Sequence, residues 1–520
     1  MAKSIVSRII VLVLIASMLL VTFASCGDPA VTTTKPQTET TTPPTANTTV
    51  KPTLNYPEPV KGLKDTTNGS TVTFIFVDGA TGGYTADSIW VDPESGDLDD
   101  VDTGIIERNA KIEEDLGVTI DPNLISTVGI DGLQEYCKAT FDAQLPDIDV
   151  YCGYQYFDIS LATQKHLYNL NDLVNPTTGE KLIDISKPYW ATNYIESITY
   201  NDYMYWVTGD LSLRYTGGLY CTFVNTELYD TNVKIAYEGK TIYQIVREGN
   251  WTMDTMIKMA DLADNDVDGD GKITQGEVAG FVYQNNDIWD GMAFGCQVEF
   301  GKKVTNLTGE DEITIHLLTD QKASDFAAFC STLYKAPYTL GVAGTDSVEL
   351  MNTFANGEAL FAVNQLYQSP IFLSDMESFA IIPTPKLNNS QKNYASGCHD
   401  SLTLYGISRY SDVPVAAAAT LELMAFYGST LVAPVFYKSY ILGGRTVRED
   451  ESIEMIELIR KGFDSDFVAA WSNSIDNIVH IYRDPGNCSG FANVKKYKAK
   501  LWPNRLNDLI DRLEEAATEE

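Results

Sequence analysis

Strand-like and helix-like segments alternate along most of this 520-residue chain, and that alternation constrains its fold more than any other feature. Residues 71–77 and 118–120 have the β-branched and aromatic content of strands. Residues 103–117 between them have the spacing of a helix, with Ala110 among the inward-facing positions and Gly117 as its stop. Alternating elements of this kind predict an α/β architecture.

Later parts of the chain continue this alternation. Strands are predicted at residues 147–151, 359–363 and 379–382. About the last 70 residues are mostly helical by their periodicity. The body that begins near residue 70 is about 450 residues long, which is too many for one hydrophobic core, so two domains are expected.

The N-terminus predicts export. Basic residues precede an apolar run, residues 9–21, and small residues come immediately before Cys26. A short apolar core with this ending is typical of a signal peptide, residues 1–25, rather than of a membrane span. The cysteine in this position resembles a bacterial lipobox, which implies cleavage before Cys26 and lipid attachment to its sulfur. An ordinary secreted protein with a chance cysteine is the alternative. No second apolar run is expected to approach the roughly 20 residues that cross a bilayer.

Residues 26–69 are predicted to hold the lipid anchor and a linker. Residues 29–53 are dominated by Thr and Pro and have almost nothing to bury, so they are expected to stay extended and disordered. The formal net charge of −34 disfavours nucleic acid and anionic lipid surfaces as partners. We expect a monomer at the extracellular face of the bacterial cytoplasmic membrane, held there by its lipid.

The cysteine pattern does not predict a metal site. Of the eight cysteines, seven follow Cys26, and none of these forms a Cys-x-x-Cys pair. We interpret them mainly as buried apolar side chains, which suits a reducing habitat. One or two disulfides are the alternative, because exported proteins commonly pair their cysteines.

The sharpest motif is an acidic loop in mid-chain, DVDGDGKITQGE, which matches the EF-hand calcium loop at every informative position. Calcium prefers about six to eight oxygen ligands, which the carboxylates and a backbone carbonyl of such a loop supply. Gly271 allows the sharp turn at the sixth position. The predicted ligands are Asp266, Asp268, Asp270, the backbone carbonyl of Lys272, Thr274 and Glu277. A solvated acidic turn without an ion is the alternative.

The surroundings of this loop indicate a structural ion. Residues 251–263 before the loop have the spacing of an amphipathic helix, whereas residues 280–283 after it have the composition of a strand. A second helix and a second loop would be needed for a sensor pair. We therefore expect Ca²⁺ that pins one loop rather than a calcium switch.

A set of motifs stands in a distinctive order along the body. They are IIERNAKIEEDLGVTI, PDIDVYCGYQYFDISLATQKHLYNLNDL, YNDYMYWVTGD, NWTMDTMIKMADLADNDVDGDGKIT, FANGEALFAV and FAIIPTPKLNNSQKNY. Together with the lipobox and the Thr-rich linker, this ordered set resembles the extracellular solute-binding proteins of ABC transporters, in their carbohydrate-type group. The chain departs from the family pattern at Trp206, at Thr208-Gly209 and at residues 397–400.

The resemblance implies a two-lobed α/β fold like that of type 2 periplasmic binding proteins, with hinge strands and a helical C-terminal part. Lobe 1 would span about residues 70–180 with a returning segment near 365–410, and lobe 2 about residues 190–360 with the C-terminal helices. Hinge closure around a ligand makes such proteins recognisable to a permease. The implied function is to capture a carbohydrate, such as an oligosaccharide, and deliver it to an ABC permease, without catalysis.

Sugar-binding clefts combine flat aromatic rings with carboxylates and amides that bind hydroxyl groups. In open α/β sheets, ligands bind beyond the carboxyl ends of strands, where several such side chains are expected here. The predicted ligand contacts are Tyr154, Tyr156, Trp206, Asp210, Trp289, Asp290, His399, Asp400 and Trp471. For each aromatic side chain a core or surface position is the alternative, and for His399 a hydrogen-bonded structural role.

Two other functions stay open. A surface-anchored glycoside-active enzyme would need two carboxylates across a cleft, about 5–10 Å apart. With 71 acidic residues, some pair always qualifies, so this match says little. A calcium-dependent surface adhesin would lose attachment without calcium, whereas a structural ion would only add thermal stability.

Overall fold

This computed structural model describes residues 54–77, 88–443 and 449–517. The chain divides into two compact units after Asn55. Nearly all of the first unit lies outside the described residues, and with it the predicted signal peptide, Cys26 and the Thr/Pro-rich linker. The second unit, Tyr56–Glu520, begins earlier than the boundary near residue 70 expected from the sequence. A short helix, α2 (Lys64–Thr67), already packs on the body before the first strand.

The first lobe is built on a four-stranded sheet in the order β11-β3-β1-β2. Its strands are β1 (Thr71–Val77), β2 (Thr119–Ile125), β3 (Val150–Tyr154) and β11 (Thr403–Ile407). β1 pairs in parallel with both β2 and β3, and β11 closes the edge antiparallel to β3. The predicted strand at 147–151 is thus shifted toward the C-terminus, and Tyr154 lies inside β3 rather than beyond it.

Helix α4 (Asp100–Leu116) connects β1 to β2, as the sequence predicts. The Asp99 side chain accepts hydrogen bonds from the first turn, and Gly117, with φ of 68°, ends the helix in the left-handed conformation. The expectation for Ala110 is wrong, because Ala110 is exposed while Arg108 and Asn109 are buried. Both of these side chains donate to the carbonyl oxygen of Ile89, which compensates their burial.

The second lobe is built on a five-stranded sheet in the order β10-β4-β9-β5-β8. Its strands are β4 (Tyr220–Asn225), β5 (Ala279–Tyr283), β8 (Thr339–Gly341), β9 (Ala359–Gln365) and β10 (Phe379–Ile382). β4 is antiparallel to both of its neighbours, whereas β5 is parallel to β9 and β8. Helix α11 (Met253–Ala263) packs on β5, and the acidic loop connects the two, so the predicted helix–loop–strand order is confirmed.

The expected lobe boundaries need one correction and one addition. β10 pairs with β4 of the second sheet, so only the last part of the 365–410 segment, β11, returns to the first lobe. Helix α16 (Pro414–Tyr427), which lies outside the expected ranges of both lobes, contacts α4, β1 and β11 and so belongs to the first lobe. A connecting segment near Cys398 forms an isolated antiparallel bridge with Leu219, where the chain passes between the lobes.

One apolar stretch, Pro414–Ser439, is long and apolar enough to cross a membrane, contrary to the expectation from the sequence. However, 78% of its most apolar window is buried inside the protein. Since the core helix of a globular protein has the same composition, we interpret this stretch as α16 and its continuation in the first lobe.

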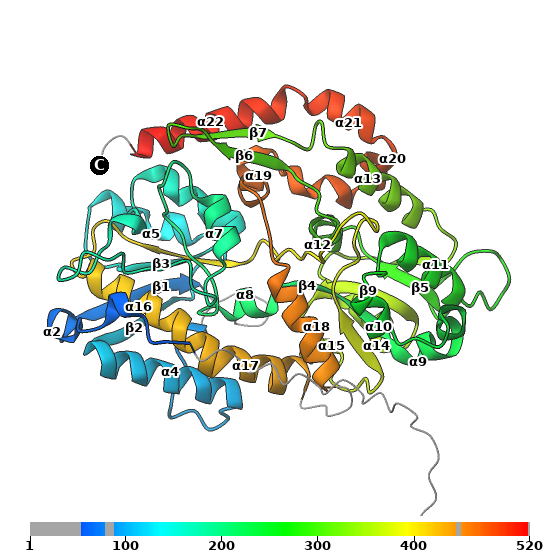
Figure 1. The fold of residues 1–520 in the computed structure, drawn as a ribbon, viewed down its shortest axis with the longest axis horizontal. Helices are drawn as coiled ribbons and strands as arrows, with labels where there is room; N and C mark the ends of the chain where they lie inside the picture. Colours follow the sequence, from blue (N-terminus) through cyan, green and yellow to red (C-terminus); the bar gives the residue numbers. More distant parts are fainter. Residues whose placement is uncertain (1–53, 78–87, 444–448, 518–520) are drawn as a thin grey trace, which may run out of the picture. The chain divides into compact units, whose positions relative to one another are not determined.

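The C-terminal part is mostly helical, as predicted. Its helices are α18 (Glu449–Lys461), α19 (Phe467–Ala470), α20 (Pro485–Ser489), α21 (Phe491–Lys498) and α22 (Leu501–Ala517). In Figure 1, α22 runs beside the hairpin of β6 (Gly301–Thr305) and β7 (Asp311–Ile315). The seven cysteines after Cys26 are free thiols, and all except the half-buried Cys398 are buried, as expected for apolar side chains.

Candidate functional site

A cavity lies where side chains of both lobes and of the C-terminal part meet. It is lined by Gln155, Tyr156, Tyr194, Tyr220, Asp290, Phe294, Cys398, Asp400, Phe463, Asp464, Ser465, Ala469, Ala470, Ser472, Asn473, Val479 and His480. The volume of the cavity is about 30 Å³, which is room for about two water molecules. A sugar therefore needs more room than this cavity provides.

Three of the predicted ligand contacts line this cavity. Tyr156 comes from α6 (Gln155–Asp158) at the end of β3, and Asp290 from α12 (Ile288–Gly295) of the second lobe. Asp400 precedes β11, and its carbonyl oxygen accepts a hydrogen bond from the backbone N–H of Tyr156 at 2.9 Å. His399 lies beside them, with Nδ1 3.3 Å from the Asp400 carboxylate. The structure thus brings together residues from three distant parts of the sequence.

Five other predicted contacts do not line the cavity. Buried at the end of β3, Tyr154 has its ring under the guanidinium of Arg214. Trp206 and Trp289 donate their indole N–H groups to backbone carbonyls, at 3.2 and 2.8 Å, within the core. Two further side chains, Asp210 and Trp471, are also buried, the first in an ion pair with Arg460 and the second stacked on Phe467. Large rings gain most from complete burial, which explains why the tryptophans are in the core.

Sequence reasoning missed the C-terminal contribution to the cavity. Phe463, Asn473 and His480 reach it from a segment with no strand end or motif to mark it. The imidazole of His480 lies face to face with the Tyr156 ring, with centroids 5.7 Å apart and planes 14° apart. The sequence offers one signal for this contribution, the scarcity of histidine. The chain has only four histidines, and two of them, His399 and His480, lie at the cavity or beside it.

Charge in the cavity is balanced by close partners. Burial alone would raise the pKa of Asp400, but the neighbouring His399, His480 and Arg483 outweigh it and hold that pKa at about 2. His480 Nε2 lies 3.5 Å from the Asp400 carboxylate, and His399 Nε2 lies 3.5 Å from that of Asp287. Asp400 is therefore a permanent anion, able to accept hydrogen bonds from hydroxyl groups.

Asp290 has a different environment. Burial raises the pKa of Asp290 to about 6, even though the guanidinium of Arg483 opposes that shift. Arg483 Nε donates to both carboxylate oxygens of Asp290, at 3.2 and 3.0 Å. This ion pair connects the part of the chain around Arg483 to α12 of the second lobe.

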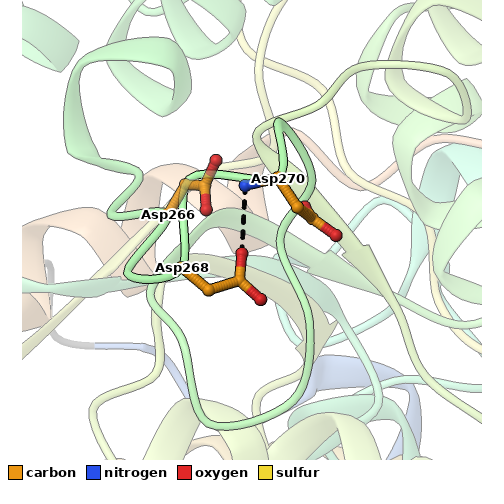
Figure 2. A group of neighbouring side chains, drawn as sticks. All are labelled: Asp266, Asp268 and Asp270. Atoms are coloured by element: carbon orange, nitrogen blue, oxygen red, sulfur yellow. Dashed lines mark hydrogen bonds between the residues drawn. The ribbon is translucent and has the colours of Figure 1, made fainter.

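The acidic loop lies apart from the cavity residues in sequence, between α11 and β5. Figure 2 shows the side chains of Asp266, Asp268 and Asp270, whose ligand atoms lie within 4.8 Å of one another. The two oxygens of Asp266 accept backbone N–H groups from Gly269 and Gly271, at 2.7 and 2.8 Å. These bonds fold the loop so that its three carboxylates converge.

The other predicted ligands complete an oxygen-rich loop. Both carboxylate oxygens of Glu277 face back into the loop, accepting N–H groups of Val267 and Thr274, each at 2.8 Å. Ile273 is buried and donates its N–H to the carbonyl of Pro337, which fixes the loop to the body. Carboxylates, a hydroxyl and backbone carbonyls are hard oxygen donors, so the residues present fit calcium.

Neither a protein-family model nor a curated protein matches the chain. Among solved structures, a cyclo/maltodextrin-binding protein complexed with maltotetraose is 13% identical and aligns over 86% of this chain and 97% of its own, with a TM-score of 0.51. The fold is that of a two-lobed solute-binding protein. Its prediction from the sequence is thereby confirmed.

Two further solved structures to which the chain is similar come from Listeria monocytogenes. The ABC substrate-binding protein Lmo0181, in complex with cycloalternan, is 11% identical, with 83% of this chain and 98% of that chain covered and a TM-score of 0.49. The maltose-binding periplasmic protein MalE, in complex with maltose, is 14% identical, with 87% and 98% covered and a TM-score of 0.49.

Proposed function

We propose that this protein is the substrate-binding component of an ABC importer and that it captures a carbohydrate in the cavity between its lobes. The observation that carries this proposal is the convergence of Tyr156, Asp290 and Asp400, from three parts of the chain, on one closable site. An aromatic ring beside the permanent anion Asp400 and the carboxyl group of Asp290 suits the apolar face and the hydroxyl groups of a sugar. The similar structures hold maltotetraose, cycloalternan and maltose, which supports the choice of ligand class.

The cellular setting is part of the same proposal. A lipid on Cys26 would tether the protein to the outer face of the cytoplasmic membrane, and the Thr/Pro-rich segment would give the body reach. After closing on its ligand, the body would dock on a membrane permease, as hinge closure signals occupancy in this fold.

A thermal-shift screen of residues 54–520 against mono- and oligosaccharides tests the proposal. We expect one glycan class to raise the melting temperature in a saturable way, because a ligand that binds only the folded state stabilises it. Tyr156→Ala should abolish the shift, whereas the matched control Tyr497→Ala, at a residue 78% exposed on α21, should keep it. A flat response to sugars together with a shift from peptides would contradict the carbohydrate assignment.

A glycoside-active enzyme is the second candidate, favoured by one observation. Asp290 and Asp400 line the same cavity and their pKa values, about 6 and about 2, are pushed apart as in an acid–base pair. The ion pair of Asp290 with Arg483 argues against it, because a carboxylate held by a guanidinium is a poor proton donor. Release of reducing ends from the bound glycan would identify the enzyme, and an intact glycan the binding protein.

We also propose that the acidic loop binds a structural Ca²⁺ through Asp266, Asp268, Asp270, the Lys272 carbonyl, Thr274 and Glu277. Support comes from the three converging carboxylates and from the position of the loop at the start of β5, a central strand. An ion here would fix the connection between α11 and that strand.

Removing calcium should lower the melting temperature without abolishing ligand binding. At a calcium concentration tenfold above Kd, the ion contributes about 1.4 kcal/mol to the free energy of unfolding. Glu277→Gln should remove this calcium dependence, measured by calorimetry with calcium and with chelator, while Glu312→Gln on the exposed hairpin should retain it. Chelation could instead abolish attachment to cells or glycans and leave the melting temperature unchanged. That result would support the adhesin and contradict a structural role for the ion.

A further inference from the structure

Residues 463–480, called here the C-terminal segment, supply much of the lining of the proposed ligand site. Of the 17 residues that line the cavity, nine come from residues 463–480. Pockets for small molecules have volumes of about 300–1,000 Å³, and the cavity here has about 30 Å³. A sugar therefore enters only if part of this lining moves.

Tyr156 of the first lobe is the point where the segment is held. The Tyr156 hydroxyl donates to Oδ1 of Asn477 at 3.0 Å, and the Tyr156 carbonyl accepts from Nδ2 of Asn473 at 2.8 Å. His480 faces the Tyr156 ring and lies 3.5 Å from the Asp400 carboxylate. Three side chains of one segment thus contact a single tyrosine: one stacks on its ring, and the other two form hydrogen bonds with its hydroxyl and its carbonyl.

The segment has two further attachments, one within this contact and one after it. Arg483 binds Asp290 on α12, and Asp476 forms an ion pair with Lys498 and accepts the indole N–H of Trp502 at 3.3 Å. At the first attachment the backbone takes the left-handed conformation at two successive residues, Asp476 (φ 55°) and Asn477 (φ 54°). Asp and Asn adopt this conformation more readily than other residues that carry a side chain, and such conformations cluster at clamps and switches.

We propose that residues 471–480 form an autoinhibitory lid, in which Asn473, Asn477 and His480 occupy Tyr156 until a carbohydrate displaces them. The lid rests on the proposed function for the nature of the displacing ligand, but its closed state is a property of the unliganded protein. Displacement would free the Tyr156 ring for stacking against a sugar, while the ion pair of Arg483 with Asp290, beyond the end of the lid, keeps the segment attached.

Hydrogen–deuterium exchange of unliganded protein, residues 54–520, tests the lid directly. Backbone N–H groups of Ser474, Asn477 and His480 are hydrogen-bonded within the segment, so their exchange reports its opening. Tyr156→Phe removes the hydroxyl bond to Asn477 and keeps the ring, which should speed exchange in peptides covering 471–480 about fivefold, for a bond worth about 1 kcal/mol.

Tyr427→Phe is the matched control, because the Tyr427 hydroxyl donates to Asp115 at 2.7 Å within the first lobe, away from the cavity. Exchange in 471–480 should be unchanged in this variant. Equal exchange in wild type, Tyr156→Phe and the control would overturn the lid, since the contact would then not hold the segment.

A binding measurement with maltotetraose as the probe separates the lid from the proposed function. If the lid competes with the sugar, Tyr156→Phe should bind maltotetraose about fivefold more tightly than wild type. Weaker binding would overturn autoinhibition, because the hydroxyl would then serve the sugar and not the lid. If neither protein binds the probe, the proposed ligand class loses support, while the exchange comparison still decides whether the lid exists.

Discussion

Arg483→Met is expected to lower the free energy of unfolding by about 3–5 kcal/mol, the largest loss among the substitutions considered. The substitution removes both hydrogen bonds from Arg483 Nε and leaves the carboxylate of Asp290, which is 4% exposed, without its cation. An uncompensated charge at such a site costs far more than the ion pair itself contributes. Urea unfolding followed by tryptophan fluorescence measures the change.

Two comparisons show whether the unpaired charge is the cause. The double variant Asp290→Leu with Arg483→Met should recover most of the loss, because it removes both charges at once. Arg247→Met is the surface control: Arg247 pairs with Glu451 and Glu454 at exposed positions, where such bridges contribute about 0–1 kcal/mol. Equal losses at Arg483 and Arg247 would contradict the argument.

Glu422 on α16 is expected to make the protein less stable as the pH rises. This side chain is fully buried and accepts hydrogen bonds from the Tyr189 hydroxyl, from Trp190 Nε1 at 2.9 Å and from the Asp184 N–H at 3.2 Å. Burial raises the pKa of Glu422 to about 7, although all three donors oppose that shift. Between the pKa of an unfolded Glu, about 4.5, and about 7, the folded state holds a proton that the unfolded state has lost.

The stability from this group is therefore complete below about pH 4.5 and is lost as the pH rises through 7. From pH 5 to pH 8 its share of the unfolding free energy should fall by about 2–3 kcal/mol. Glu422→Gln has no proton to lose, so the difference between wild type and variant should change by that amount across the range. Asp158, whose pKa burial also raises to about 7, gives the same slope in both proteins and cancels. A constant difference would mean that Glu422 stays ionised.

Much of the fold could be predicted because local signals agreed with it. The capping residues around α4 and the helix–loop–strand order of the acidic loop depend on neighbours in sequence. Lobe membership depends on pairing instead, and strand composition alone does not show that β10 joins β4 while β11 joins β3. The apolar stretch that contains α16 was not predicted from the sequence, because Glu422 interrupts its run of apolar residues.

The candidate site was only partly predictable for a related reason. The end of one predicted strand indicated Tyr156 and the start of another indicated Asp400, and the structure brings both to the cavity. The contribution of His480 and its neighbours comes from contacts such as that of Gln155 with the carbonyl of Ala470, 315 residues apart. No periodicity encodes such a contact, so the lid residues could not be found from the sequence.

The place of β11 has a consequence for how the chain assembles during synthesis. The second sheet is contiguous in sequence, from β4 to β10, and can form as soon as residue 382 has emerged. The first sheet waits for β11, about 250 residues after its partner β3, and until then β3 presents an open edge. Because pairing over so long a separation is slow, the half of the protein that is translated first should be the half that is completed last. An interrupted chain that stops before residue 403 would keep its second lobe and expose the edge of its first.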